Sequence, residues 1–126
     1  MTVSYIASLK TTRMVAVVNA IDANASPGFI EIGTAGMAAV LCTIPLAKPS
    51  FSENGGVITM LGTPISANGS ATDTAAAARI KDGGGNMVVT GLTVGASQGF
   101  DIVLTSTAIT SGQPVTLNSM TITHSP

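Results

Sequence analysis

One cysteine, Cys42, and one histidine, His124, are the residues of this sequence best suited to nucleophilic catalysis. Such catalysis needs a base beside the nucleophile, usually a histidine that a third group orients. His124 falls close to the end of the sequence, where chains tend to fray, and is predicted to be an exposed polar residue of the last strand. Cys42 alternates with Val40 and Ile44, which predicts a buried thiol that stays protonated and inert. We therefore expect neither residue to be catalytic.

Carboxylates are the other source of acid–base chemistry, and the sequence has six Asp and Glu residues. Their spacing gives no sign that two of them converge, as a paired general acid and base must. The Cys and His clusters of zinc sites and the alternating Asp residues of calcium loops are absent from the sequence. We expect no catalytic residue, no metal and no cofactor, and we predict that the protein is not an enzyme. The six acids are Asp22, Glu31, Glu53, Asp73, Asp82 and Asp101.

Two glycine-rich stretches could suggest a phosphate site, and we interpret both as turns. Asp82-Gly83-Gly84-Gly85-Asn86 lacks the Lys-Ser/Thr of a P-loop, and a strand pattern follows it. Gly33-Thr34-Ala35-Gly36-Met37 also leads into a strand pattern and lacks a third glycine at dinucleotide spacing. Neither stretch opens a helix, so neither has the helix N-terminus that holds a phosphate. The first is the strongest hairpin signal in the sequence.

Aromatic residues are few: Tyr5, Phe29, Phe51 and Phe100, with no tryptophan. Exposed aromatic rings are the usual platform for carbohydrate, so their scarcity speaks against a glycan site. Phe100 precedes a predicted strand and is expected to pack in the core. Phe51 lies in a predicted loop, where it is a candidate anchor for a protein interface as well as a candidate core residue.

The charge content limits the classes of partner that the protein can bind. Only 9% of the 126 residues are charged, against about 25% in ordinary globular domains. The five cations, Lys10, Arg13, Lys48, Arg79 and Lys81, are scattered, which excludes the basic face that nucleic acid requires. Two interpretations remain, a small domain that is simply poor in charge and a surface that neighbouring subunits cover. We favour the second, because interface cores are depleted of charge.

The length indicates one domain, residues 1–126, with a core large enough to fold without a metal or disulfide. A single cysteine cannot form an intramolecular disulfide. The first residues lack the basic n-region and uninterrupted apolar stretch of a signal peptide, so we expect none. No stretch has the 18 or so apolar residues of a membrane span, and we expect no membrane association.

The first segment has helical periodicity. Its apolar residues recur at spacings of three and four, which places them on one face of a helix over residues 4–23. Ser4 is the predicted N-cap, and turn-forming residues follow Ala23. The helix either covers its own sheet or serves as an arm that meets a partner. The residues of the stripe are Ile6, Leu9, Met14, Val17, Val18 and Ile21.

After Gly28 the apolar period changes to two, which predicts seven or eight short strands over residues 28–124. Gly, Asn and Pro separate the strands, an arrangement typical of an antiparallel β-sandwich, either jelly-roll-like or immunoglobulin-like. In the last strand the alternation slips by one residue, which predicts a bulge near Asn118-Ser119. Residues 65–74 have no apolar period and are predicted to be an exposed loop. The strands are expected around residues 30–32, 40–46, 57–61, 76–81, 87–92, 100–104 and 115–123.

Several stretches together resemble small structural proteins encoded among the head and tail genes of tailed bacteriophages. The resemblance covers most of the sequence, and none of its motifs is catalytic. The stretches are Arg13-Met14 with Ile21-Asp22, Ile32-Gly33-Thr34-Ala35-Gly36-Met37-Ala38, Ala78-Arg79-Ile80-Lys81-Asp82, Gly91-Leu92-Thr93-Val94-Gly95, Asp101-Ile102-Val103-Leu104, and Gly112-Gln113-Pro114-Val115 with Thr121-Ile122-Thr123-His124.

The resemblance implies a virion component, a capsid decoration or cement protein that binds the major capsid protein without covalent chemistry. It implies a location on the outer capsid surface after synthesis in the bacterial cytoplasm, and a homo-oligomer, with a trimer as the expected state. The alternative is a tail- or fibre-associated module that recognises a host receptor or glycan. The scarcity of aromatic residues favours the decoration protein over this alternative.

Overall fold

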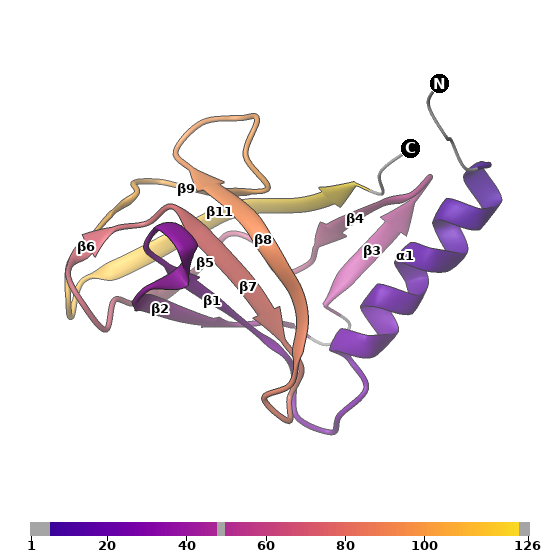
Figure 1. The fold of residues 1–126 in the computed structure, drawn as a ribbon, viewed down its shortest axis with the longest axis horizontal. Helices are drawn as coiled ribbons and strands as arrows, with labels where there is room; N and C mark the ends of the chain where they lie inside the picture. The colour runs from indigo at the N-terminus through magenta and orange to yellow at the C-terminus, as the bar shows by residue number, and fades with distance from the viewer. Residues whose placement is uncertain (1–5, 48–49, 124–126) are drawn as a thin grey trace.

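The computed structural model describes residues 6–47 and 50–123, and these residues form a mainly β structure with one N-terminal helix (Figure 1). Most strands fall where apolar residues alternate with polar ones, so the change of period after Gly28 is confirmed. The elements are α1 (Ala7–Ile21), β1 (Phe29–Gly33), the 3-10 helix η1 (Ala35–Met37), β2 (Val40–Pro45), β3 (Phe51–Asn54), β4 (Val57–Met60), β5 (Ile65–Asn68), β6 (Asp73–Thr74), β7 (Ala77–Lys81), β8 (Met87–Gly95), β9 (Ile102–Leu104), β10 (Ala108–Ile109) and β11 (Pro114–Thr123).

The predicted N-terminal helix is confirmed, and it is shorter than residues 4–23. It begins at Ala7 after the extended residue Ile6, which makes no side-chain capping bond, and the predicted cap Ser4 lies outside the described residues. It ends at Ile21, where the N–H of Asp22 donates to the carbonyl of Val18 at 3.0 Å. The helix rests mainly on β3 and β4 and reaches β8, which places it at one end of the sheet (Figure 1).

The predicted sandwich of two antiparallel sheets is not what forms. Nine strands make one strongly curled sheet, in the order β2-β1-β7-β8-β9-β11-β4-β3 with β5 added on β11, and β6 and β10 form a separate pair (Figure 1). The sheet is mixed, because β8 and β9 run parallel while the other pairs run antiparallel. The chain therefore wraps a single sheet around its core.

Irregular pairing explains how one sheet can curl so far. The register between β11 and β9 shifts between Leu117 and Ser119, which confirms the bulge predicted near Asn118. The register between β7 and β8 shifts twice, and Gly91 of β8 has a φ of 76°. Bulges bend a strand and increase its twist, so these long strands change direction instead of continuing flat.

The curl brings the β2 edge of the sheet back beside β5. Ser70, just after β5, donates its N–H to the carbonyl of Leu41 at 2.7 Å, and its hydroxyl reaches the same oxygen at 3.2 Å. Since β5 is itself paired with β11, this contact joins two strands that are far apart in the order of the sheet. The result is a half-barrel with its apolar side chains inside.

The parallel pair β8–β9 has a short connection, which side-chain bonds stabilise. Asp101 accepts bonds from the N–H and the hydroxyl of Thr93, at 2.9 and 3.1 Å. The N–H of Asp101 donates in turn to the Thr93 hydroxyl at 3.0 Å. Parallel neighbours normally need a crossover of about a dozen residues or more. Here the paired Thr93 and Asp101 hold residues 96–101 in a compact turn, which the alternation pattern did not reveal.

The core consists of the inward residues of the predicted strands. Alternating positions such as Ile30 and Ile32, or Ala78 and Ile80, are fully buried. Two predictions about loops were wrong: Phe51 lies in β3, and residues 65–74 contain β5 and β6. β5 shows little apolar alternation because it is only half-buried, and its pairing with β11 is what orders it.

Candidate interaction surfaces

Cys42 lies where the sequence placed it, in the core. It is fully buried on β2, and its Sγ lies 3.8 and 3.7 Å from the carbonyl oxygens of Ala67 and Asn68. Burial raises the pKa of the Cys42 thiol, so the reactive thiolate is disfavoured. His124 lies outside the described residues. The structure thus gives Cys42 a packing role.

The carboxylates are spread over the molecule, each bound to its own neighbours. Asp22 accepts the N–H of Ser50 at 3.1 Å, and Glu53 accepts the N–H of Gly56 at 2.6 Å. Within residues 6–47 and 50–123, no three acidic, histidine or cysteine side chains gather in a way that could hold a metal ion. Asp73 accepts from Thr74, and Asp101 from Thr93, in separate parts of the sheet. In this arrangement Asp22, Glu53, Asp73 and Asp101 each bind a nearby backbone N–H and stabilise their local turn or loop.

The predicted hairpin at Asp82–Asn86 is confirmed between β7 and β8. The Asp82 carboxylate accepts the N–H groups of Gly84 and Asn86, both at 2.9 Å. These bonds, led by the one from Asn86, lower the pKa of Asp82. The backbone donors that could hold a phosphate are therefore occupied by a carboxylate of the same loop. The other glycine-rich stretch forms the short helix η1 between β1 and β2, a turn as predicted.

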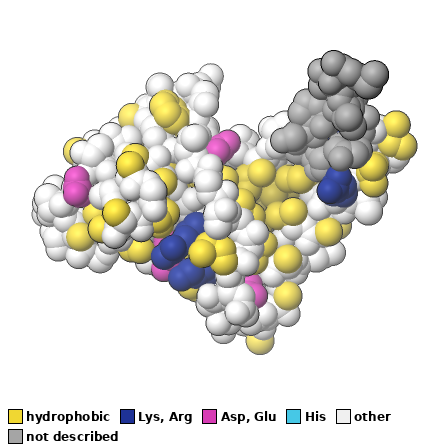
Figure 2. Space-filling view, viewed as in Figure 1, with side chains coloured by type: hydrophobic (Ala, Val, Ile, Leu, Met, Phe, Trp, Pro, Cys, Tyr) yellow, Lys and Arg dark blue, Asp and Glu magenta, His cyan; other side chains and the backbone are white. Residues whose placement is uncertain are grey.

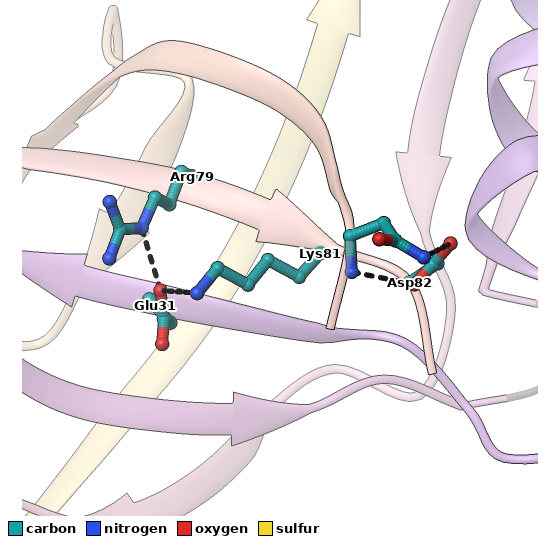
Figure 3. Close-up of polar contacts among 5 residues, drawn as sticks. Glu31, Arg79, Lys81 and Asp82 are labelled. Carbon is teal, nitrogen blue, oxygen red and sulfur yellow. Dashed lines mark hydrogen bonds and ion pairs between the residues drawn. The ribbon is translucent and has the colours of Figure 1, made fainter. Parts of the chain in front are cut away.

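The charged side chains that do come together lie on neighbouring strands. Glu31 of β1 pairs across the sheet with Arg79 of β7, and its Oε1 lies 2.6 Å from Arg79 Nε and 3.0 Å from Lys81 Nζ (Figure 3). Burial alone would raise the pKa of Glu31, but the hydrogen bonds and charges of Lys81 and Arg79 lower it below its ordinary value. Two cations therefore share one carboxylate, which leaves a local excess of one positive charge.

The two phenylalanines lie in different environments, Phe51 in the core, one of its two expected places, and Phe100 outside the core where it was expected. Phe51 is 4% exposed and belongs to the core, so the candidate interface anchor is not on the surface. Phe100, expected in the core, is 43% exposed. Its ring lies over Gly95, where even a Cβ atom would come within 2.1 Å of the ring. Phe100 is therefore fixed at the surface by a glycine that leaves room for it.

Helix α1 has apolar side chains on its solvent side as well as on its buried side. Met14 and Ile21 are buried, whereas Ile6, Leu9 and Val15 are 71%, 41% and 39% exposed. Figure 2 shows hydrophobic side chains along α1 and in the hollow between α1 and β8. A surface helix usually presents polar side chains to solvent, so apolar side chains of this size on the solvent side call for an explanation. We call Ile6, Leu9 and Val15 the outer apolar set of α1.

In the described part of the chain, no helix is long and apolar enough to cross a membrane. No protein-family model matches the sequence, and no curated protein or solved structure matches it. Of the five large apolar side chains that are exposed in the described part of the chain, three belong to the outer apolar set of α1.

Proposed function

We propose that this protein is a virion structural protein, a decoration or cement protein of a tailed-bacteriophage head. It binds the major capsid protein on the outer surface of the assembled capsid and stabilises the shell by non-covalent contacts. The observation that carries the proposal is the uncovered apolar surface of α1 on a molecule that is poor in charge. The resemblance to phage head and tail proteins supports the same conclusion.

The exposed side chains of α1 suit an assembled environment. The charged residues of α1 are Lys10 and Arg13, and its other side chains are neutral. Exposed large apolar side chains that gather on one element can mark a protein interface. We assign the outer apolar set of α1 to contacts between copies of the chain, with the trimer as the proposed state.

The mechanism is linkage between binding and assembly. A protein that binds the assembled shell, and not the separated subunits, stabilises the shell by mass action. Repetition of the contact over many lattice positions, and its multiplication within an oligomer, lets each contact be weak while the whole is strong. Neither effect requires a catalytic residue, a metal or a cofactor.

Co-sedimentation tests this proposal directly. Purified protein is mixed with expanded capsids, with unexpanded capsids and with host cells, and each pellet is analysed for bound protein. The proposal predicts saturable binding to expanded capsids. Co-sedimentation with cells and never with capsids would refute it and would favour a tail or fibre module.

The observation that favours this second function is the exposure of Phe100. Its ring is held at the surface over Gly95, as a ring that stacks on a sugar would be. Phe100→Ala is the variant that separates the two functions. A receptor module would lose cell binding with this change, whereas a decoration protein would keep its capsid binding.

A further inference from the structure

The outer side of β7 carries a groove that neither α1 nor the core covers. Because Ala78 and Ile80 point into the core, the alternate residues Ala77, Arg79 and Lys81 face the other side of the sheet. There η1 and β8 border a hollow of about 290 Å³, which we call the Arg79 groove. It is lined by Met37, Ala77, Arg79, Met87, Thr90 and two glycines.

A bulge in β8 forms one wall of the groove. Ala78 pairs with Leu92 and Ile80 pairs with Val89, so β8 has one residue more than β7 over this stretch. The extra length places Thr90 and Gly91 opposite Arg79, and Gly91 has no side chain to fill the space. Bulges of this kind commonly occur beside functional sites.

The other wall is formed by η1 in an unusual backbone conformation. Met37 has a φ of 57°, the one non-glycine residue with positive φ among those described, and it follows Gly36 at 68°. Such a conformation costs energy for a side chain with a Cβ and commonly persists at functional sites. The sulfur and methyl of Met37 pack on Gly33, where an added Cβ would come within 3.1 and 3.0 Å of them.

The groove has a positive charge, which Arg79 contributes. Arg79 contributes Nε to its bond with Glu31, and its terminal nitrogens point away from that carboxylate (Figure 3). These terminal groups carry further N–H donors in a planar fork that suits a carboxylate. Arg79 is the only charged residue of the lining, and Lys81 already offsets part of the Glu31 charge. The space-filling view shows Lys and Arg atoms beside hydrophobic atoms on this face (Figure 2).

We propose that the Arg79 groove binds an extended segment of a partner protein that presents one large apolar side chain next to a carboxylate. The apolar side chain lies between Met37 and Met87, and the carboxylate binds the terminal nitrogens of Arg79. Methionines adapt their shape to an incoming side chain, and Met87 is 49% exposed before binding. The inference rests on the proposed function for the identity of the partner, the major capsid protein.

The volume and the charge of the groove favour such a protein segment over a drug-sized ligand, a phosphate or a nucleic acid. A volume of about 290 Å³ is at or below the lower end of the roughly 300–1,000 Å³ of drug-sized ligand sites, so it suits one or two side chains. A phosphate or nucleic acid would need several cations around it, and the lining has one. The methionine walls would contribute nothing to an isolated anion. A short acidic and apolar segment uses both features.

Capsid binding by three variants tests the inference. Arg79→Gln removes the positive charge of the groove, and Met87→Ser removes a partly exposed apolar side chain from its lining. Lys81→Gln is the matched control, because Lys81 also bonds Glu31 but does not line the groove. We expect Arg79→Gln to weaken binding to expanded capsids roughly tenfold or more. We expect about three- to tenfold from Met87→Ser, because half of that side chain remains to be buried. Lys81→Gln should bind within about twofold of the wild type, because Lys81 does not line the groove and Arg79 keeps its bond to Glu31.

The outcomes separate this inference from the proposed function. If the wild type binds capsids and all three variants bind equally well, the groove inference fails while the proposed function stands. If the wild type does not bind capsids, the proposed function fails, and the groove is tested with peptides. Methyl NMR then follows Met37 and Met87 during titration with acetyl-Leu-Asp-amide, acetyl-Leu-Asn-amide and inorganic phosphate.

The inference predicts that both methyl signals shift with the acidic peptide, much less with the neutral one, and no longer in Arg79→Gln. Equal shifts with the two peptides would overturn it. Equal shifts with phosphate would also overturn it, because the groove would then be only an anion site. Shifts that depend on protein concentration without any peptide would overturn it in favour of a second copy of this chain.

Discussion

The outer apolar set of α1 gives the most quantitative prediction. Leu9 and Val15 lie on the solvent side of the helix, 41% and 39% exposed, so replacing both by glutamine removes apolar surface without opening a cavity. We expect the double variant to fold with a free energy of unfolding within about 0.5 kcal/mol of the wild type, as surface substitutions usually do. We expect its self-association to be weaker than that of the wild type.

The magnitude follows from the exposed fractions. Full burial of a Leu or Val side chain contributes roughly 1.5–3 kcal/mol, so the 41% and 39% that remain exposed can contribute about 0.6–1.2 kcal/mol each in a contact. The pair together contributes about 1.2–2.4 kcal/mol per protomer. Since about 1.4 kcal/mol is a factor of ten, the dissociation constant of the oligomer should rise roughly tenfold for each contact that contains both residues.

Sedimentation-velocity measurements over a wide range of protein concentration provide the assay. Asn19→Gln is the matched control, because Asn19 is also exposed on α1 and the change leaves its polarity intact. Thermal unfolding monitored by circular dichroism checks that each variant is folded. Association of the double variant at wild-type strength would refute the assignment of this surface, and so would a wild type that stays monomeric at every concentration.

Three further predictions concern residues inside the fold. Because its neighbours lower the pKa of Glu31, its charge stabilises the native state above the ordinary value of 4.5, and this contribution is lost as the pH falls through the lowered value. Glu31→Gln should therefore be less stable than the wild type near neutral pH, with the difference narrowing in acid, as urea unfolding at several pH values will measure. The buried thiol of Cys42 should react with a thiol reagent at least about 10³-fold more slowly in the native protein than in urea, and fast native labelling would contradict its burial. Gly33→Ala should lower the free energy of unfolding by about 1–3 kcal/mol, because the new Cβ would lie 2.3 Å from the carbonyl oxygen of Ala39; unchanged stability would show that this backbone can move.

Local pattern predicted the helix and the well-buried strands. Strands such as β1 and β7 have side chains that alternate between core and outside, and this alternation is visible as a period of two. The bulge near Asn118 was predictable for the same reason, since the apolar phase slips by one residue there. These features depend on neighbouring residues alone.

Strands held mainly by distant partners were not predictable. β5 has only half-buried side chains at Ile65 and Ala67, and its order comes from pairing with β11, including a 2.9 Å bond between the hydroxyls of Ser66 and Thr116. In β3 the core contact is made by Phe51 alone, which is too little to give a period. Polar, half-exposed strands look like loops in sequence.

The choice between one curled sheet and two stacked sheets also depended on distant contacts. The same alternation suits both arrangements, because either one buries one side of each strand. The bulges of β8 and the contact of Ser70 with Leu41 favour the half-barrel over two stacked sheets. The parallel pair β8–β9 depends in addition on the bonds between Thr93 and Asp101.

The position of the helix was predictable from its periodic stripe, whereas the exposure of Leu9 and Val15 follows from how α1 rests on β3 and β4. The covered surface that charge depletion favours stays a prediction. The Arg79 groove forms where η1 and the β8 bulge border β7. These elements meet only because segments distant in the sequence pair with β7. No local pattern around Arg79 could show this.

The central claim is that the protein stabilises an assembled phage head. Calorimetry of expanded capsids tests it most directly, with and without the purified protein at about 100 times its dissociation constant. Linkage predicts up to about 2.7 kcal/mol of stabilisation for each occupied site, and hence a higher temperature of shell disruption that returns to its starting value when the protein is washed away. An unchanged disruption temperature on capsids that carry the bound protein would contradict the account.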